Sequence, residues 1–333
     1  MNTNQNKHSY ALPIAMMFAL FFMIAFVTGL QNPMGVIVKN QFQASNLLSQ
    51  LGNFANFLAY AFMGIPAGLM LQKIGYKKTA LTAILVGIAG VAITFFSGKI
   101  ESFAVYLIGA FVGGFSMCML NTVVNPMLNT LGGEGKRGNQ LLQFGGTLNS
   151  MGATIVPVLV GYLMGDVAKA TISDANPALF LAIGIFVLAF IVLYSMSIPE
   201  PHIVAEKSTE KNTHSPLSFR HFVLGAIAIF VYVGVEVGIP NIANLYMTGD
   251  LQINATTAGT VVGTYWFLML VGRLTGGVLG SKFSSKSMLS FAAVLGLVFV
   301  LLAIFLPKDQ MVSMPVFQSD ISFGLAQVPV SIM

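Results

Sequence analysis

The sequence predicts an all-α, multi-pass membrane protein with nine complete transmembrane helices and the start of a tenth. The 333 residues are 56% hydrophobic and only 8% charged, with a mean hydropathy of +0.81, whereas a soluble domain carries about 25% charged residues. The apolar residues form runs long enough to cross a bilayer, and basic residues gather in alternate connectors. This composition excludes a soluble enzyme, a nucleic-acid-binding protein and a disordered chain.

Each predicted helix is an apolar run of about 20 residues or more. The first run is too long for the core of a signal peptide and has no small-residue cleavage site, so we expect it to remain as a helix. The segment 199–218 is polar and predicts a loop, and 323–333 is apolar but only about half a span long. The nine complete runs are 11–38, 47–71, 79–97, 103–131, 140–165, 178–198, 219–247, 255–279 and 288–306.

The distribution of lysine and arginine predicts the orientation in the membrane. With the N-terminus in the cytoplasm, eleven basic residues fall in the inner connectors and four in the outer connectors. Because cytoplasmic loops carry the excess of basic residues, we expect a cytoplasmic (inner) membrane protein with a cytoplasmic N-terminus.

An internal repeat divides the chain into two halves. The connectors after the second and eighth predicted helices share one pattern: glycine, four residues, lysine, an apolar residue, a small residue, any residue, lysine. The two copies are offset by 209 residues and comprise Gly68, Lys73, Gly75 and Lys77, then Gly277, Lys282 and Lys286. The repeat predicts a six-helix half at 1–198, a cytoplasmic loop at 199–218 and an incomplete second half at 219–333.

The repeat also gives an expected length. Two complete six-helix halves would need about 408 residues at about 34 residues per helix and connector. We therefore expect the 333-residue chain to lack part of its second half and not to transport. Uptake by this chain alone would contradict that expectation.

The first copy of the repeat resembles the signature between the second and third helices of the major facilitator superfamily, with Gln72 in place of the usual aspartate. Other segments resemble the fucose/glucose–galactose permease (fucose–proton symporter) family. The resemblance implies two six-helix halves, sugar transport by alternating access and, commonly, proton symport. Fucose permeases carry acids where this chain has Asn32 and Asn121. The segments that carry the family resemblance are Gln31–Pro33, Asn121–Pro126, Leu131–Gly132, Asn149–Gly152, Tyr232–Val237 and Gly272–Arg273.

Amide side chains within the predicted helices are the main candidates for sugar binding. An amide both donates and accepts hydrogen bonds, as sugar hydroxyls require; the alternative is hydrogen bonding between helices. Asn32 and Asn125 precede prolines, which break helices and can border transporter sites, although a plain kink is equally consistent. Trp266 is expected to stack on the sugar ring, with ordinary helix packing as the alternative. The predicted sugar-binding residues are Asn32, Asn121, Asn125, Gln143, Asn149, Asn241, Asn244 and Trp266.

Glu236 is the only acid within the predicted helices, and Arg273 is the only arginine or lysine within them apart from Arg220, at the start of 219–247. Burying an unpaired carboxylate is costly, so Glu236 is a candidate for coupling to a proton or sodium ion. A structural hydrogen bond, or a place at the outer mouth of its helix, is the alternative. Arg273 lies about two turns before an inner connector, which favours a structural contact over substrate binding. The residues of the repeated connectors are expected to hold the inner side closed.

No catalytic residue, cofactor or metal site is predicted. The chain has one cysteine and no phosphate-binding loop, and its four histidines lie outside membrane depth. The leading interpretation is a monomeric secondary active importer of a hexose or a related sugar. An exporter of amphipathic molecules would need fewer amides and a more apolar site, and a non-transporting sensor would need a long soluble extension. A membrane enzyme has the least support, because no nucleophile–base pair is found.

Overall fold

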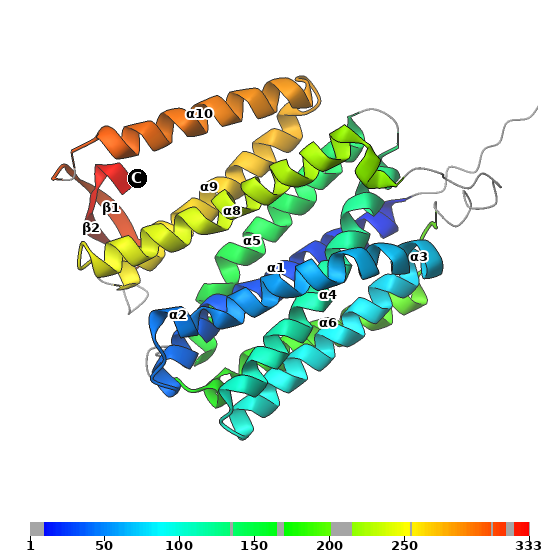
Figure 1. Cartoon of the computed structure of the whole chain (residues 1–333), viewed down its shortest axis with the longest axis horizontal. Helices are drawn as coiled ribbons and strands as arrows, with labels where there is room; N and C mark the ends of the chain where they lie inside the picture. The colour runs from blue at the N-terminus through cyan, green and yellow to red at the C-terminus, as the bar shows by residue number, and fades with distance from the viewer. Residues whose placement is uncertain are drawn as a thin grey trace, which may run out of the picture. The chain divides into compact units, whose positions relative to one another are not determined.

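The computed structural model of the chain is built mainly of long helices (Figure 1). It describes residues 10–133, 136–164, 170–200, 215–253, 255–307, 309–317 and 323–332. The elements are α1 (Ala11–Gln41), α2 (Asn46–Ser49), α3 (Leu51–Lys99), α4 (Phe103–Gly132), α5 (Arg137–Met164), η1 (Ile172–Ala175), α6 (Asn176–Ser195), η2 (Pro216–Ser218), α8 (Arg220–Gly249), α9 (Ala255–Leu279), α10 (Ser285–Phe305), β1 (Met311–Phe317), β2 (Phe323–Pro329) and η3 (Val330–Ile332).

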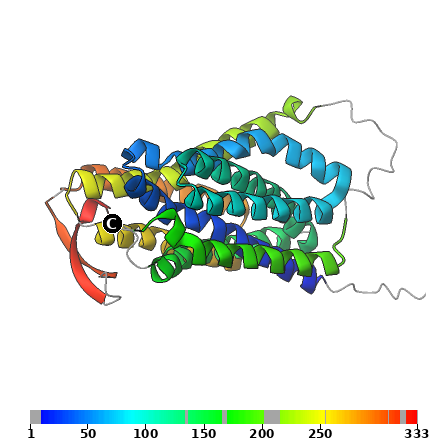
Figure 2. The same ribbon diagram turned by 90° about the horizontal axis from the view of Figure 1, so that it is seen from below.

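Seven helices in the described part of the chain are long and apolar enough to cross a membrane: α1, α3, α4, α6 with η1, α8, α9 and α10. The 49 residues of α3 contain non-helical backbone at Gly75, where φ is 83° and ψ is 175°. Figures 1 and 2 show two arms of α3 joined by a sharp turn. These arms contain the predicted helix 79–97 and residues 51–71 of the predicted helix 47–71, whose first residues fall in α2. Helix α5 contains most of the predicted helix 140–165. The count of nine spans itself stays a prediction.

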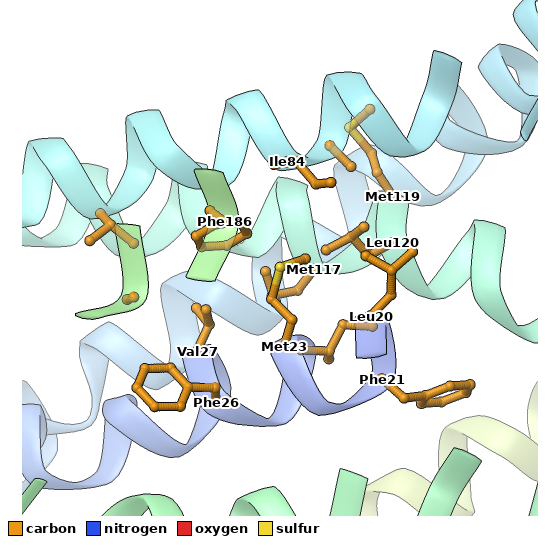
Figure 3. Close-up of a cluster of buried hydrophobic side chains, with 14 of the residues drawn as sticks. Leu20, Phe21, Met23, Phe26, Val27, Ile84, Met117, Met119, Leu120 and Phe186 are labelled. Atoms are coloured by element: carbon orange, nitrogen blue, oxygen red, sulfur yellow. The ribbon is translucent and has the colours of Figure 1, made fainter. Parts of the chain in front are cut away.

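The chain divides into two compact units, Met1–Lys207 with Leu270–Ser281, and Ser208–Met269 with Lys282–Met333. The core of the first unit is formed by apolar side chains of α1, α3, α4 and α6. In Figure 3, Leu20 and Met23 of α1 point towards Met117 and Leu120 of α4. All four of these side chains are at most 1% exposed. The first unit therefore has a closely packed interior in which α1 packs against α4.

Glycines of α4 allow α3 to approach closely, as the small residues of this helix predict. A Cβ atom at Gly109 would lie 2.9 Å from the Thr94 backbone nitrogen, and one at Gly114 would overlap the Asn56 carbonyl oxygen. At Gly113, a Cβ atom would meet nothing within 4 Å. The close approach therefore depends on Gly109 and Gly114, and Gly113 provides a matched control.

Replacing Gly114 with alanine should lower the free energy of unfolding by about 1–3 kcal/mol, because the new methyl group forces the two helices apart. Gly113→Ala should be neutral or stabilise the protein by up to about 1 kcal/mol, since alanine favours the helix over glycine. Thermal unfolding of the purified protein in detergent measures both changes. Equal losses in the two variants would contradict this account of the packing.

The second unit contains α8, most of α9, α10 and an antiparallel hairpin of β1 and β2. Met311 pairs with Pro329 at one end of the hairpin and Phe317 pairs with Phe323 at the other. A small core joins the hairpin to the helices through Met247, Ala258, Val261, Met314 and Val328.

The predicted start of a tenth helix at 323–333 is wrong in this structure, because residues 323–329 form strand β2. A helix much shorter than about 12 residues is only marginally stable by itself. Pairing with β1 satisfies the backbone groups of β2 instead. An apolar run of half a span does not by itself distinguish these two outcomes.

Candidate functional site

Three polar side chains of α3 and α4 form one hydrogen-bonded string, which we call the Tyr60–Asn121–Asn125 string. Asn121 Nδ2 donates to the Tyr60 hydroxyl oxygen and to the Met117 carbonyl oxygen, both at 3.1 Å. Asn125 Nδ2 donates to the Asn121 backbone carbonyl at 2.9 Å and lies 3.5 Å from Asn121 Oδ1. Since neither α4 nor residues 51–71 of α3 contain a charged residue, the string presents neutral hydrogen-bonding groups.

Two predicted sugar-binding residues of α5 lie elsewhere in the first unit. Asn149 Nδ2 donates to the Phe21 carbonyl of α1 at 3.4 Å, which is the contact between helices weighed as the alternative. Gln143 is exposed, and its Cβ lies beside Gly277 of α9. No contact in the described part of the chain joins either side chain to the Tyr60–Asn121–Asn125 string. Asn32 lies within α1, but its side chain is outside the described residues.

A second polar cluster lies between α8 and α9 in the second unit. The Tyr265 hydroxyl donates to the Glu236 backbone carbonyl at 3.1 Å, and the Trp266 ring meets the Tyr265 ring edge-on at 5.4 Å. Glu236 and Trp266 are both half-buried. On α8, Asn241 and Asn244 are both exposed, and the Asn241 amide donates to the Val237 carbonyl of its own helix at 2.8 Å. The structure therefore brings the candidate coupling residue and the candidate stacking residue to the same pair of helices.

The first copy of the repeated connector ties α3 to the C-terminal end of α6. Lys77 Nζ donates to the carbonyl oxygens of Tyr194 at 2.8 Å and Met196 at 2.5 Å. The Glu200 carboxylate accepts the backbone N–H groups of Tyr76 at 2.6 Å and Lys77 at 2.9 Å. A basic group on helix C-terminal carbonyls and an acid on helix N-terminal N–H groups are both favourable. Lys73, by contrast, is exposed, and Gly68 has open space where a Cβ would stand.

The role of Glu200 was not predicted from the sequence, although an acid between two prolines directly after a predicted helix was a usable signal. Glu200→Gln should lower the free energy of unfolding by about 1–3 kcal/mol, because the neutral amide leaves a helix N-terminal N–H without a charged acceptor. Glu101→Gln removes the same charge at an exposed turn and should change stability little. Thermal unfolding measures both variants, and equal stabilities for the two would show that Glu200 does not anchor this turn.

The glycine of the second copy lies where the last turns of α9 contact α5, both within the first unit. Gln140 Nε2 donates to the Gly277 carbonyl, and Lys136 Nζ donates to the Ser281 carbonyl, each at 3.1 Å. Arg273 Nη1 donates back to the Gly146 carbonyl of α5 at 3.1 Å. Three donors, two of them charged, therefore hold α5 against the end of α9. Lys282 and Lys286 are exposed beyond this contact.

Comparisons with known proteins add independent findings. The sequence pattern of the Major Facilitator Superfamily matches residues 17–332. A glucose/galactose transporter of Brucella abortus is 28% identical over 310 residues, which cover 90% of this chain and 74% of that protein. The L-fucose-proton symporter of Escherichia coli K12 is 24% identical over 332 residues, covering 90% of this chain and 74% of the symporter.

A solved structure shares the fold. The crystal structure of FucP, a Major Facilitator Superfamily transporter in the outward conformation, matches this chain with a TM-score of 0.75 at 21% identity. The match covers 89% of this chain and 78% of the FucP chain.

Proposed function

The chain belongs to the major facilitator superfamily of membrane transporters, and from that premise we propose that it is a secondary active transporter that imports a hexose or a related monosaccharide by alternating access. The proposal places it as a monomer in the cytoplasmic membrane, with the N-terminus in the cytoplasm. It divides the chain into halves at 1–198 and 219–333, joined by a loop at 199–218. Residues 201–214 of that loop lie outside the described residues.

The neutral Tyr60–Asn121–Asn125 string is the observation that carries the sugar proposal. Amide and hydroxyl groups supply both donors and acceptors, and an uncharged polyol needs both. A charged substrate would require a compensating charge at membrane depth, and neither α4 nor residues 51–71 of α3 supply one. The names of two relatives, a glucose/galactose transporter and an L-fucose-proton symporter, support the same substrate class.

Coupling to a proton or sodium ion is assigned to Glu236 in this proposal. It is the only acid within the predicted helices, and in the structure it is half-buried beside the Tyr265–Trp266 pair. A carboxylate in this setting can bind a proton or a small cation when the sugar is bound, and release it when the sugar leaves.

Sugar binding can be measured directly, because Trp266 is the only tryptophan of the chain. Titrating the purified 333-residue chain with glucose, galactose and fucose should give a saturable change in tryptophan fluorescence for at least one of them. Trp266→Phe should remove the signal and supply the background. If the sugars give no change while an amphipathic dye does, the substrate class is wrong and an exporter is favoured.

A further inference from the structure

Both side-chain N–H groups of Asn121 are engaged by its own protein neighbours. Its side-chain amide has two N–H hydrogens, one directed to the Tyr60 hydroxyl oxygen and the other to the Met117 carbonyl, both at 3.1 Å. Its Oδ1 faces the Asn125 amide nitrogen at 3.5 Å. To donate to a sugar, Asn121 would have to break its bond to the Tyr60 hydroxyl or its bond to the Met117 carbonyl.

The two ends of the string have unused capacity. The Tyr60 oxygen accepts from Asn121, and its own O–H has no acceptor in the described part of the chain. Asn125 uses only its Nδ2 in the bonds of the string, so its exposed Oδ1 is left to accept a hydrogen bond. The string therefore offers one O–H donor at its Tyr60 end and one carbonyl acceptor at its Asn125 end.

Asn121 also prepares Tyr60 to donate. Hydrogen bonds in a chain polarise one another, so a phenol oxygen that accepts a bond becomes a stronger O–H donor. The Asn121 amide also fixes the position of the hydroxyl, whereas a free phenol could turn its O–H in either direction. The neighbouring Phe57 ring lies 6.1 Å from the Tyr60 ring, centroid to centroid, and adds an apolar surface next to the donor.

We propose that Tyr60 is a specificity-determining residue that donates a hydrogen bond to one sugar hydroxyl, that Asn125 Oδ1 accepts from another, and that Asn121 is a positioning residue that does not touch the sugar. This inference rests on the proposed function and deepens it. It assigns the direct hydrogen bond to the sugar to the Tyr60 phenol of α3, whereas the sequence had indicated the Asn121 amide of α4. A site built to bond a hydroxyl discriminates strongly against a ligand that lacks it.

The test compares sugars that differ by one hydroxyl. Wild type, Tyr60→Phe and the control Tyr106→Phe are titrated by calorimetry with the best-binding hexose and its series of monodeoxy analogues. Tyr60→Phe should weaken the parent hexose about 3- to 10-fold, the usual worth of one hydrogen bond. The deoxy analogue that lacks the hydroxyl contacted by Tyr60 should bind wild type and Tyr60→Phe equally, because it cannot accept the Tyr60 hydrogen bond in either protein. Tyr106 is 2% exposed and its hydroxyl has no partner in the described part of the chain, so Tyr106→Phe should bind as wild type does.

The positioning role of Asn121 gives a second readout. Asn121→Leu should weaken binding of the parent hexose. Adding Tyr60→Phe to it should cause no further loss of affinity, because both changes remove the same hydrogen bond between Tyr60 and the sugar. Additive losses would show that Asn121 contacts the sugar itself. Equal weakening of every analogue by Tyr60→Phe would overturn the assignment of Tyr60 as a hydroxyl donor.

Failure of this inference can be told apart from failure of the proposed function. Hexose binding that does not depend on Tyr60 overturns the inference and leaves the sugar proposal intact. If no hexose binds but a cyclic polyol such as inositol does, with a loss in Tyr60→Phe, the donor assignment stands and the sugar proposal falls. If wild type binds no member of either panel, both are overturned.

Discussion

Replacing Glu236 with glutamine should reduce gradient-driven sugar accumulation at least about 10-fold while leaving sugar exchange across the membrane within about 2-fold of wild type. Glutamine keeps the size of the side chain but can neither take up a proton nor compensate a bound cation. Exchange moves the loaded transporter back and forth and needs no net cation cycle, so it should survive. Both rates are measured in proteoliposomes with an imposed proton or sodium gradient, in a form with two complete six-helix halves, because the repeat predicts that the 333-residue chain does not transport.

Asp250→Asn is the matched control for this variant, because Asp250 is an exposed acid at the C-terminal end of the same helix, α8. It should accumulate sugar as wild type does. Undiminished accumulation by Glu236→Gln would show that another group couples the cation, or that the transporter is not coupled.

Replacing Arg273 with alanine should open the contact between α5 and the end of α9. The guanidinium donates to the Gly146 carbonyl at 3.1 Å, and a hydrogen bond from a charged group is worth about 1.5–3 kcal/mol. Loss of this bond should lower the ratio of molecules with the α5–α9 contact closed to those with it open about 10-fold or more. Arg220→Ala removes an arginine that is exposed at the start of α8 and should leave this ratio unchanged.

The opening can be followed with a cysteine in place of Phe144. The Phe144 ring lies 3.1 Å from where a Cβ at Gly277 would stand, so this position is covered while the contact is closed. The one native cysteine, Cys118, is buried and can be replaced by alanine. Arg273→Ala should speed the reaction of Phe144→Cys with a membrane-impermeant maleimide about 10-fold. Equal rates with and without Arg273 would exclude a gating role for this bond.

The helices were the part of the fold that could be predicted from the sequence. The predicted range 255–279 coincides with α9, and α4 differs from its predicted range by one residue. Both are accurate because the thickness of the bilayer fixes the length of an apolar run. The non-helical backbone at Gly75 falls in the connector that was predicted between 71 and 79.

The contacts that define the site could not be predicted, because they join distant residues. Asn121 meets Tyr60 from 61 positions away, and Glu200 meets the Tyr76 N–H from 124 positions away. Sequence spacing shows which residues share a helix face but not which face of another helix they meet. The pairing of β1 with β2 was not predicted for a related reason. The seven residues of β2 form a short apolar run, and such a run is compatible with either a strand or the start of a helix.

Sugar counterflow in proteoliposomes tests the central claim most directly. Vesicles preloaded with unlabelled glucose, galactose or fucose should accumulate the same labelled sugar transiently, without any imposed ion gradient. The assay is run in parallel on the 333-residue chain, which the repeat predicts to be inactive, and on a form with two complete six-helix halves. Counterflow of at least one hexose by the form with two complete halves is the predicted result, and no counterflow of any hexose by either form would contradict the assignment as a sugar transporter.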